Sequence, residues 1–428
     1  MLILPGSNAL SAFRTPPPAT ITPQPDWRRN LAALVAAVFI GFTGFTVVMP
    51  FLPIYIQQMG ETDVGRIAVW TGVALGVTPA MTALLAPAWG RLADRYGRKF
   101  MVLRSLAAFV VLMAAMGFVT APWHLVALRV VQGVFAGYGA LSLAMAAESA
   151  PEGRMAQSIG LVQTAQRLGP ALGPVIGAGV VGLVGLRNAF VVTAGFYLVA
   201  FVLMLVLYVE PEQRPLETHV DGTPRVAFRN VVSFENFLLL MALIFGFTFI
   251  DRSLGPVLPL HLPAIGVAET RVATASGVIF SALACAAAFG HHLCAGFLRR
   301  WGSRRTLTTA SVVSALGASG LVLARDVWTF GAAALVFGVA IGSAMTAAYT
   351  AAAAAIPEGA RAFSFGFLTS ASLIGMAISP MIAGVLAHSG IRVVFGVDAA
   401  LLLIFGVAVR QVMEEPSTVA ASPAMEDA

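Results

Sequence analysis

Charged residues are scarce in this sequence. They occupy 11% of the 428 positions, whereas an ordinary soluble domain carries roughly 25%. Apolar residues make up 58% of the chain, and the mean hydropathy is +0.86. A water-soluble core of this length could not bury so much apolar surface, but a bilayer can accommodate it. The composition therefore excludes an ordinary soluble enzyme or binding domain and indicates an integral membrane protein.

Cysteine and lysine are also rare. The two cysteines, Cys285 and Cys294, lie in one apolar segment, so we expect no disulfide framework. Lys99 is the single lysine among 26 basic residues, and the net charge of +6 comes from short clusters between apolar runs. In a soluble protein this balance would suggest a nucleic-acid partner. Here it is a topology signal, and we expect no nucleic-acid partner.

Twelve apolar runs are long enough to cross a bilayer, which takes about 20 helical residues. The first six lie near 31–57, 67–89, 100–120, 123–147, 156–184 and 190–209. The second six lie near 236–262, 271–294, 306–324, 327–353, 363–388 and 391–412. We therefore expect an all-α membrane fold of two six-helix bundles. The predicted parts are a proline-rich flexible tail (1–30, without a signal-peptide cleavage site), bundles 31–209 and 236–412, a polar linker 210–235 and a tail 413–428.

Arginine placement predicts the orientation of these spans. With the N-terminus inside, eighteen basic residues fall on the cytoplasmic side. The opposite side holds five, which are Arg66, Arg187, Arg271, Arg325 and Arg392. The positive-inside rule therefore predicts an even number of spans with both termini in the cytoplasm.

The two predicted bundles repeat one another. Pro151 in the segment APEGR corresponds to Pro357 in IPEGAR, at an offset of 206 residues, and Pro174 corresponds to Pro380 at the same offset. Phe190 corresponds to Phe395 at an offset of 205. A constant offset along the whole chain indicates a duplicated unit. Parallel repeats of this kind place a substrate site between the halves, near the middle of the bilayer.

A polar segment at 90–99 joins the second and third predicted spans and reads GRLADRYGRK. A simple cytoplasmic anchor would explain its arginines but neither Asp94 nor the glycines. The segment resembles the signature loop of the major facilitator superfamily. A degenerate copy at 296–305 lies between the eighth and ninth spans, where that family places its second copy, although the acid is missing there.

The resemblance implies a cytoplasmic gate built from Gly90, Asp94, Arg95, Gly97, Arg98, Lys99 and Glu148. In that family the loop's acid braces one conformation by contacting the positive N-terminal end of a helix in the other half, and helix N-termini attract carboxylates. Asp94 would have this role here, with Arg98 and Glu148 as charge partners. Opening of the contact would accompany a change of the accessible side.

The fifth predicted span combines glycine and proline at Gly169, Pro170, Gly173, Pro174 and Gly177. Glycines four residues apart permit close helix approach, and the prolines bend the span. A packing seam of small residues would account for this pattern. The run also resembles the antiporter motif of drug-exporting facilitators, with Gly173 and Pro174 aligned on its Gly-Pro pair.

The stretch 48–60, which reads VMPFLPIYIQQMG, resembles the twelve-helix drug:proton antiporters, especially their multidrug efflux members. The similarity is clearest from Trp27 to about Phe190 and fades in the second half. It implies a secondary active transporter that exports small apolar or amphipathic compounds in exchange for protons by alternating access. It also implies a monomer in the bacterial inner membrane whose partners are a small molecule, protons and lipid.

Asp251 is the candidate proton carrier among the ionisable residues inside predicted spans, where charge is expensive. Burial favours a protonated acid and a nearby arginine favours the carboxylate, so a changing environment would move a proton. A permanent ion pair is the alternative. Arg252 is expected to be a poor partner because adjacent residues point to different sides of a helix. That leaves Arg129 or Arg167 as the partner.

The other intramembrane charges leave alternatives open. Arg129 lies in LRVVQG, which resembles the family's fourth-span motif, where an arginine is associated with proton coupling; it could also be a structural cation. Arg167 shares one side of the fifth span with Gln163, and either lines the cavity or contacts the other half. Asp398 is expected to be structural or wetted by the lumen.

Three further interpretations concern a metal site, a metabolite exporter and an enzyme. His291, His292 and Cys294 are close in sequence, but consecutive histidines on a helix diverge, so we expect no metal and no cofactor. An exporter of a defined metabolite, such as a sugar or organic anion, fits three intramembrane arginines against two aspartates. A lipid-linked transferase would need clustered acids, or a nucleophile beside a base, on the loops. We therefore expect a transporter and no enzyme.

Overall fold

The structure is a computed structural model of the chain, and it describes residues 26–151, 154–210, 236–356 and 361–413. Every regular element in these ranges is a helix. The first bundle comprises α1 (Trp27–Val48), η1 (Met49–Phe51), α2 (Leu52–Gln58), α3 (Val64–Tyr96), α4 (Arg98–Met116), α5 (Pro122–Phe135), α6 (Tyr138–Ser149) and α7 (Met155–Leu207). The second comprises α9 (Phe237–His261), η2 (Leu262–Ile265), η3 (Glu269–Arg271), α10 (Val272–Leu323), α11 (Val327–Ala355), α12 (Arg361–Leu386), η5 (Ala387–Ser389) and α13 (Ile391–Val412).

Glycines with positive φ interrupt the two longest helices. Gly185 in α7 has φ 78° and Gly302 in α10 has φ 76°, a conformation that costs glycine little and other residues much. The described residues contain ten helices long and apolar enough to cross a membrane. Dividing α7 and α10 at these glycines turns the ten helices into twelve segments, and the prediction of twelve spans depends on that division.

Each bundle has its own hydrophobic core. One core is built from side chains between Leu31 and Tyr208, and the other from side chains between Phe237 and Met413. Ala68 of α3 is the exception, because it joins the second core from the first bundle. The predicted linker lies outside the described residues except for Glu210, so the predicted domain boundaries stay predictions.

The most extensive contacts between the bundles are made by two helix pairs, α3 with α12 and α7 with α10, and smaller ones join α9 to α3 and α2. Backbones approach closely at both of the main pairs. A Cβ at Gly72 would overlap the carbonyl oxygen of Pro380, and a Cβ at Gly277 would overlap the carbonyl oxygen of Pro174. Val175 N also donates a hydrogen bond to Ser281 Oγ across the second pair, at 3.2 Å.

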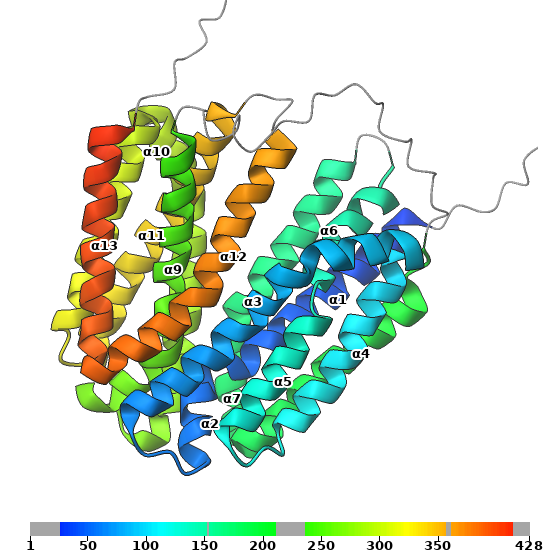
Figure 1. Cartoon of the computed structure of the whole chain (residues 1–428), viewed down its shortest axis with the longest axis horizontal. Helices are drawn as coiled ribbons and strands as arrows, with labels where there is room; N and C mark the ends of the chain where they lie inside the picture. Colours follow the sequence, from blue (N-terminus) through cyan, green and yellow to red (C-terminus); the bar gives the residue numbers. More distant parts are fainter. Residues whose placement is uncertain (1–25, 152–153, 211–235, 357–360, 414–428) are drawn as a thin grey trace, which may run out of the picture.

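These four helices diverge along their length. Figure 1 shows the bundles meeting in the lower part of the view, near α2, and separating toward the top. The separated end carries the arginine clusters of 91–99 and 299–305, so we call it the arginine-rich end. At this end, each of the four helices has a glycine at which an added Cβ would meet no neighbouring atom within 4 Å. These glycines are Gly90 of α3, Gly160 of α7, Gly296 of α10 and Gly366 of α12. The structure is therefore open toward the arginine-rich end and closed at the opposite end.

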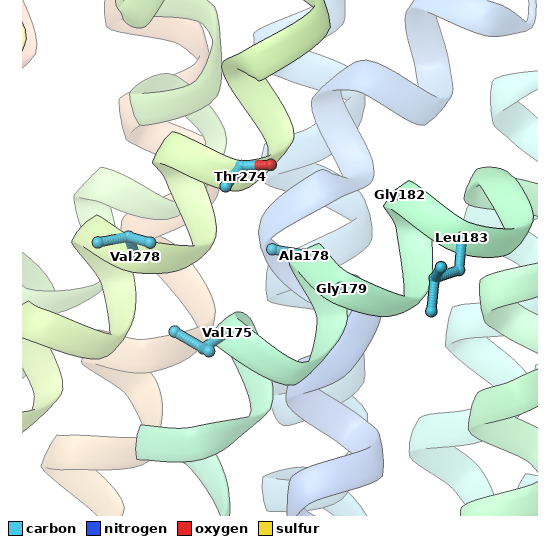
Figure 2. A pocket seen from close by; sticks show the side chains of 7 residues that line it. All are labelled: Val175, Ala178, Gly179, Gly182, Leu183, Thr274 and Val278. Atoms are coloured by element: carbon cyan, nitrogen blue, oxygen red, sulfur yellow. The ribbon is translucent and has the colours of Figure 1, made fainter.

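An apolar cleft of about 490 Å³ lies on the closed side, between α7 and α10. Figure 2 shows Val175 and Ala178 of α7 beside α10, which contributes Thr274 and Val278. Gly179, Gly182 and Leu183 complete the lining. The cleft has no ionisable side chain, so the polar residues that could handle a proton or a charged substrate lie elsewhere.

Candidate functional site

Asp251 on α9 forms an ion pair with its neighbour. Arg252 Nε lies 3.3 Å from Asp251 Oδ2, and the two side chains are 52% and 31% exposed, respectively. The expectation that Arg252 would be a poor partner was wrong, because the arginine side chain is long enough for its Nε to reach the neighbouring carboxylate. The expectation that Arg129 or Arg167 would have to supply the partner was therefore wrong as well.

Hydroxyl and imidazole groups lie on the helices around this pair. His291 Nδ1 of α10 lies 2.6 Å from Thr346 Oγ1 of α11. Thr248 Oγ1 of α9 lies 3.0 Å from Ser372 Oγ of α12, and Tyr349 of α11 is also hydrogen-bonded to Ser372. The second bundle thus joins four helices through side-chain hydrogen bonds at the level of Asp251.

Arg167 reaches the same region from the first bundle. Its side chain is exposed on α7, and its charge acts on both His291 and Tyr349. Asp251 also acts electrostatically on His291. We call these residues the central polar cluster: Arg167, Asp251, Arg252, His291, Thr346, Tyr349 and Ser372. Gln163 lies one turn before Arg167 and is exposed as well. The cluster brings together groups from both bundles, as a site between repeats requires.

Sequence reasoning missed the four residues of this cluster on α10, α11 and α12. The sequence pattern suggested His291 only as a possible metal ligand, and the described residues contain no group of three or more metal-binding side chains. Thr346, Tyr349 and Ser372 carry no charge inside their spans, so hydropathy did not distinguish them. A polar residue in each of three neighbouring spans was the available signal.

Arg129 lies outside the central polar cluster, within the first bundle. The side chain is completely buried. Its Nε donates to Ala74 O at 3.0 Å, and one terminal nitrogen donates to Gln132 Oε1 at 2.8 Å. The guanidinium also lies 5.5 Å from the ring centre of Phe45. Among the described residues, the guanidinium contacts the carbonyl of Ala74, the amide of Gln132, the thioether of Met49 and the ring of Phe45. Such contacts are typical of a structural cation.

The glycines of the predicted fifth span pack α7 against a neighbouring helix. Gly169, Gly173 and Gly177 of α7 all face α1, at Thr43, Thr46 and the carbonyl of Val47, respectively. A Cβ at any of these positions would clash with α1. Pro170 and Pro174 lie inside α7 between these contacts, and Pro174 also faces Gly277 across the interface. The glycines thus pack α7 against α1, and Pro174 packs it against the second bundle.

The loop between α3 and α4 is held by groups of the first bundle. Gly97 has φ 90°, which makes the tight turn, and Arg98 pairs with Glu148 at 2.9 Å. Glu210 Oε1 accepts hydrogen bonds from the backbone N–H groups of Arg98 at 2.7 Å and Lys99 at 3.2 Å. A carboxylate at a helix N-terminus is favourable. The side chain of Asp94 lies outside the described part, so its predicted contact with the other half remains a prediction.

The end of α7 completes this network. Lys99 Nζ donates to the carbonyls of Leu205 at 3.1 Å and Tyr208 at 2.5 Å. The Tyr208 hydroxyl lies 2.8 Å from Ser149 Oγ. Burial raises the pKa of Tyr208 to about 12, so the phenol stays neutral at physiological pH. Gly90 and Arg95, also predicted gate residues, are exposed on α3.

Comparison with known proteins agrees with this architecture. The family model described as Major Facilitator Superfamily matches residues 34–327 and 273–427. A protein named multidrug resistance protein MdtG from Serratia proteamaculans is 30% identical over 379 residues, covering 88% of this chain and 92% of that protein. Its namesake from Citrobacter koseri is 30% identical over 384 residues, covering 88% and 93%.

Solved structures share the fold at lower identity. A bacterial homologue of the human lysosomal transporter Spinster, in an inward-facing and occupied conformation, superimposes with a TM-score of 0.75 at 17% identity, covering 90% of this chain and 96% of that chain. The human organic anion transporter MFSD10 superimposes with a TM-score of 0.62 at 18% identity, covering 90% and 100%. The chain is therefore a multi-pass integral membrane protein that belongs to the Major Facilitator Superfamily.

Proposed function

We propose that this protein is a proton-coupled exporter of small apolar or amphipathic compounds. The observation that carries the proposal is the central polar cluster, which joins groups of both bundles around the accessible Asp251–Arg252 pair. Relatives that match 88% of the chain are named multidrug resistance proteins. A carboxylate that exchanges its arginine partner for a proton would couple the two fluxes.

Alternating access supplies the transport step. The bundles separate toward the arginine-rich end, which the positive-inside rule predicts to face the cytoplasm. Substrate would enter from that side of the bacterial inner membrane, with both chain termini in the cytoplasm. Rocking about the α3–α12 and α7–α10 contacts would then expose the cluster to the other side. A single chain contains both bundles, so a monomer suffices.

Transport by purified protein in proteoliposomes tests the proposal. A panel of lipophilic cations, neutral amphipaths and carboxylates would be offered with and without an imposed pH gradient. We expect gradient-driven movement of lipophilic compounds that is lost in Asp251→Asn and retained in Glu269→Gln, an exposed acid far from the cluster. Equal transport with and without the gradient would refute proton coupling.

Export of an organic anion is a second candidate, favoured by one observation. Within the cluster, Arg252 is paired with Asp251. The exposed Arg167 adds a positive charge, and no acidic side chain among the described residues forms an ion pair with it. A carboxylate substrate would neutralise it. A preference for carboxylates in the same panel that disappears in Arg167→Gln would support this candidate over the first. The comparisons with transporters do not favour a lipid-linked transferase.

A further inference from the structure

Asp398 of α13 is a buried acid that the central polar cluster does not use. The residue is 3% exposed, and its Oδ2 lies 2.5 Å from Ser253 Oγ of α9. Among the described residues, Ser253 is the one hydrogen-bond partner of the Asp398 side chain. An ionised carboxylate buried in a membrane protein without a cation is costly, so this environment favours the neutral acid.

Hydrogen counting at Ser253 supports the same protonation state. Its Oγ lies 2.9 Å from the carbonyl oxygen of Ile250 as well as 2.5 Å from Asp398 Oδ2. A serine hydroxyl has one hydrogen, and a carbonyl oxygen and a carboxylate can only accept. Two full hydrogen bonds therefore need a second hydrogen, and a protonated Asp398 supplies it. The acid would donate to Ser253 Oγ while Ser253 donates to Ile250 O.

Among the described residues, no charged group on the neighbouring helices forms an ion pair with Asp398. On α9, Asp251 and Arg252 pair with each other on the exposed side, and His261 packs against Phe395, one turn from Asp398. On α13 itself, Arg392 lies at the outer end, where its charge acts on His261. On α10, which packs along α13, the ionisable residues are Cys285, His291, His292 and Cys294, with an arginine cluster at 299–305. The other elements in contact with α13 contribute His388 of η5 and Arg361 at the start of α12, and Arg410 lies at the far end of α13 itself.

The acid lies behind a deformable part of α9. Pro256 and Pro259 are inside this helix, and each lacks the N–H that would bond the carbonyl four residues earlier, at Arg252 and Gly255. Asp251 and Arg252 immediately precede Ser253, so a movement that rearranges the ion pair also moves the partner of Asp398. The pair of α9 and α13 thus connects the central polar cluster to a second carboxyl.

We propose that Asp398 is a second proton-carrying group of this transporter, protonated in this conformation and deprotonated when α9 shifts away from α13. The proton would pass to water entering between the two helices, leaving the carboxylate. The inference rests on the proposed function, because a transport cycle must drive the shift. The first bundle lacks this pair of an acid and a serine, since Thr193 and Val47 occupy the positions equivalent to Asp398 and Ser253. The acid is therefore an addition to the duplicated framework.

Infrared spectroscopy of the purified protein tests the protonation state without transport. We expect a protonated carboxylic-acid C=O band at neutral pH in the wild type that disappears in Asp398→Asn. Ser379→Ala is the matched control, since it removes another buried hydroxyl that bonds α9, at Phe249 O, and should keep the band. A band that persists in Asp398→Asn would overturn the assignment.

Two further measurements complete the test. The first does not depend on whether Asp398→Asn folds well, and the second follows proton exchange during transport. Ser253→Ala keeps the acid but removes its partner, so the band should move in frequency; an unmoved band would overturn the proposal. In proteoliposomes, Asp398→Asn should export substrate with fewer protons exchanged per molecule than wild type and Ser379→Ala. An unchanged ratio would overturn the coupling. If wild type exchanges no protons while the infrared band is present, the proposed function fails and the protonation of Asp398 stands.

Discussion

The carbonyl oxygen of Pro174 lies against Gly277, where a Cβ would overlap it. The same arrangement recurs between Pro380 and Gly72 at the other contact between the bundles. Pro380 follows Pro174 by 206 residues and Gly277 follows Gly72 by 205, so the two contacts are repeats of one another. Duplication has therefore produced a symmetric pair of close backbone contacts about which the bundles can move.

A large side chain at either glycine should wedge this interface. We expect Gly277→Leu and Gly72→Leu to disfavour the closed arrangement by about 1–3 kcal/mol, because inserted atoms overpack the contact. Transport should fall by roughly 10–100-fold while each bundle's own core stays intact. Gly195→Leu is the control, because no neighbouring atom lies within 4 Å of a Cβ there. Normal transport by both variants would show that the close approach is dispensable.

The ion pair between Asp251 and Arg252 should matter for gradient-driven transport. Arg252 Nε lies 3.3 Å from Asp251 Oδ2, and removing the guanidinium deprives the carboxylate of this partner. We therefore expect Arg252→Gln to reduce the transport that an imposed pH gradient adds, and Arg252→Lys, which keeps a positive charge, to reduce it less. Initial transport rates with and without the gradient measure the effect. If wild type and both variants gain equally from the gradient, Arg252 does not act on the coupling.

Glu210 should stabilise the start of α4. Its carboxylate accepts two backbone N–H bonds there, and the helix dipole favours a negative charge. Glu210→Gln keeps an acceptor but removes the charge, so we expect a loss of about 0.5–1 kcal/mol in unfolding free energy. Glu210→Ala should cost more, about 1–2 kcal/mol. Thermal unfolding measures both. Glu269→Gln, an exposed acid, should have little effect.

Asp326 should make the start of α11 sensitive to acid. Hydrogen bonds from the backbone and side chain of Thr329, and from the backbone of Trp328, lower the pKa of this carboxyl. A lowered pKa means that the cap stabilises the helix above the pKa of an unfolded Asp and is lost as pH falls through the folded value. Amide exchange at Trp328 and Thr329, corrected for intrinsic rates, should therefore increase in acid. In Asp326→Ala the increase should be absent.

Much of the fold could be predicted because bilayer length and hydropathy are local properties of the sequence. The predicted end of the fifth span at 184 falls beside the glycine that interrupts α7, Gly185. Duplication was visible because prolines such as Pro174 and Pro380 kept their spacing. What the sequence could not give were contacts between distant segments. Neither the Glu210 cap on α4 nor the Ser253–Asp398 pair has a local signal.

The candidate site was predictable where a charge marked it. Asp251 and Arg167 could be selected because charge inside a span is expensive. Their relationship to His291 depends on how α7, α9 and α10 pack, which no spacing in the sequence reports. Arg129 shows the converse, since the same criterion selected a residue that packs inside the first bundle.

During transport, the bundles should rock about the Pro174–Gly277 and Pro380–Gly72 contacts. Spin labels on cysteines replacing Met155 and Trp301 would report the arginine-rich end, and labels at Val64 and Ser389 the opposite end, since all four positions are exposed. Cys285 and Cys294 would first be replaced by alanine. On acidification with substrate, the first distance should shorten while the second lengthens. If both distances stay constant, or change in the same direction, the bundles do not rock about these contacts.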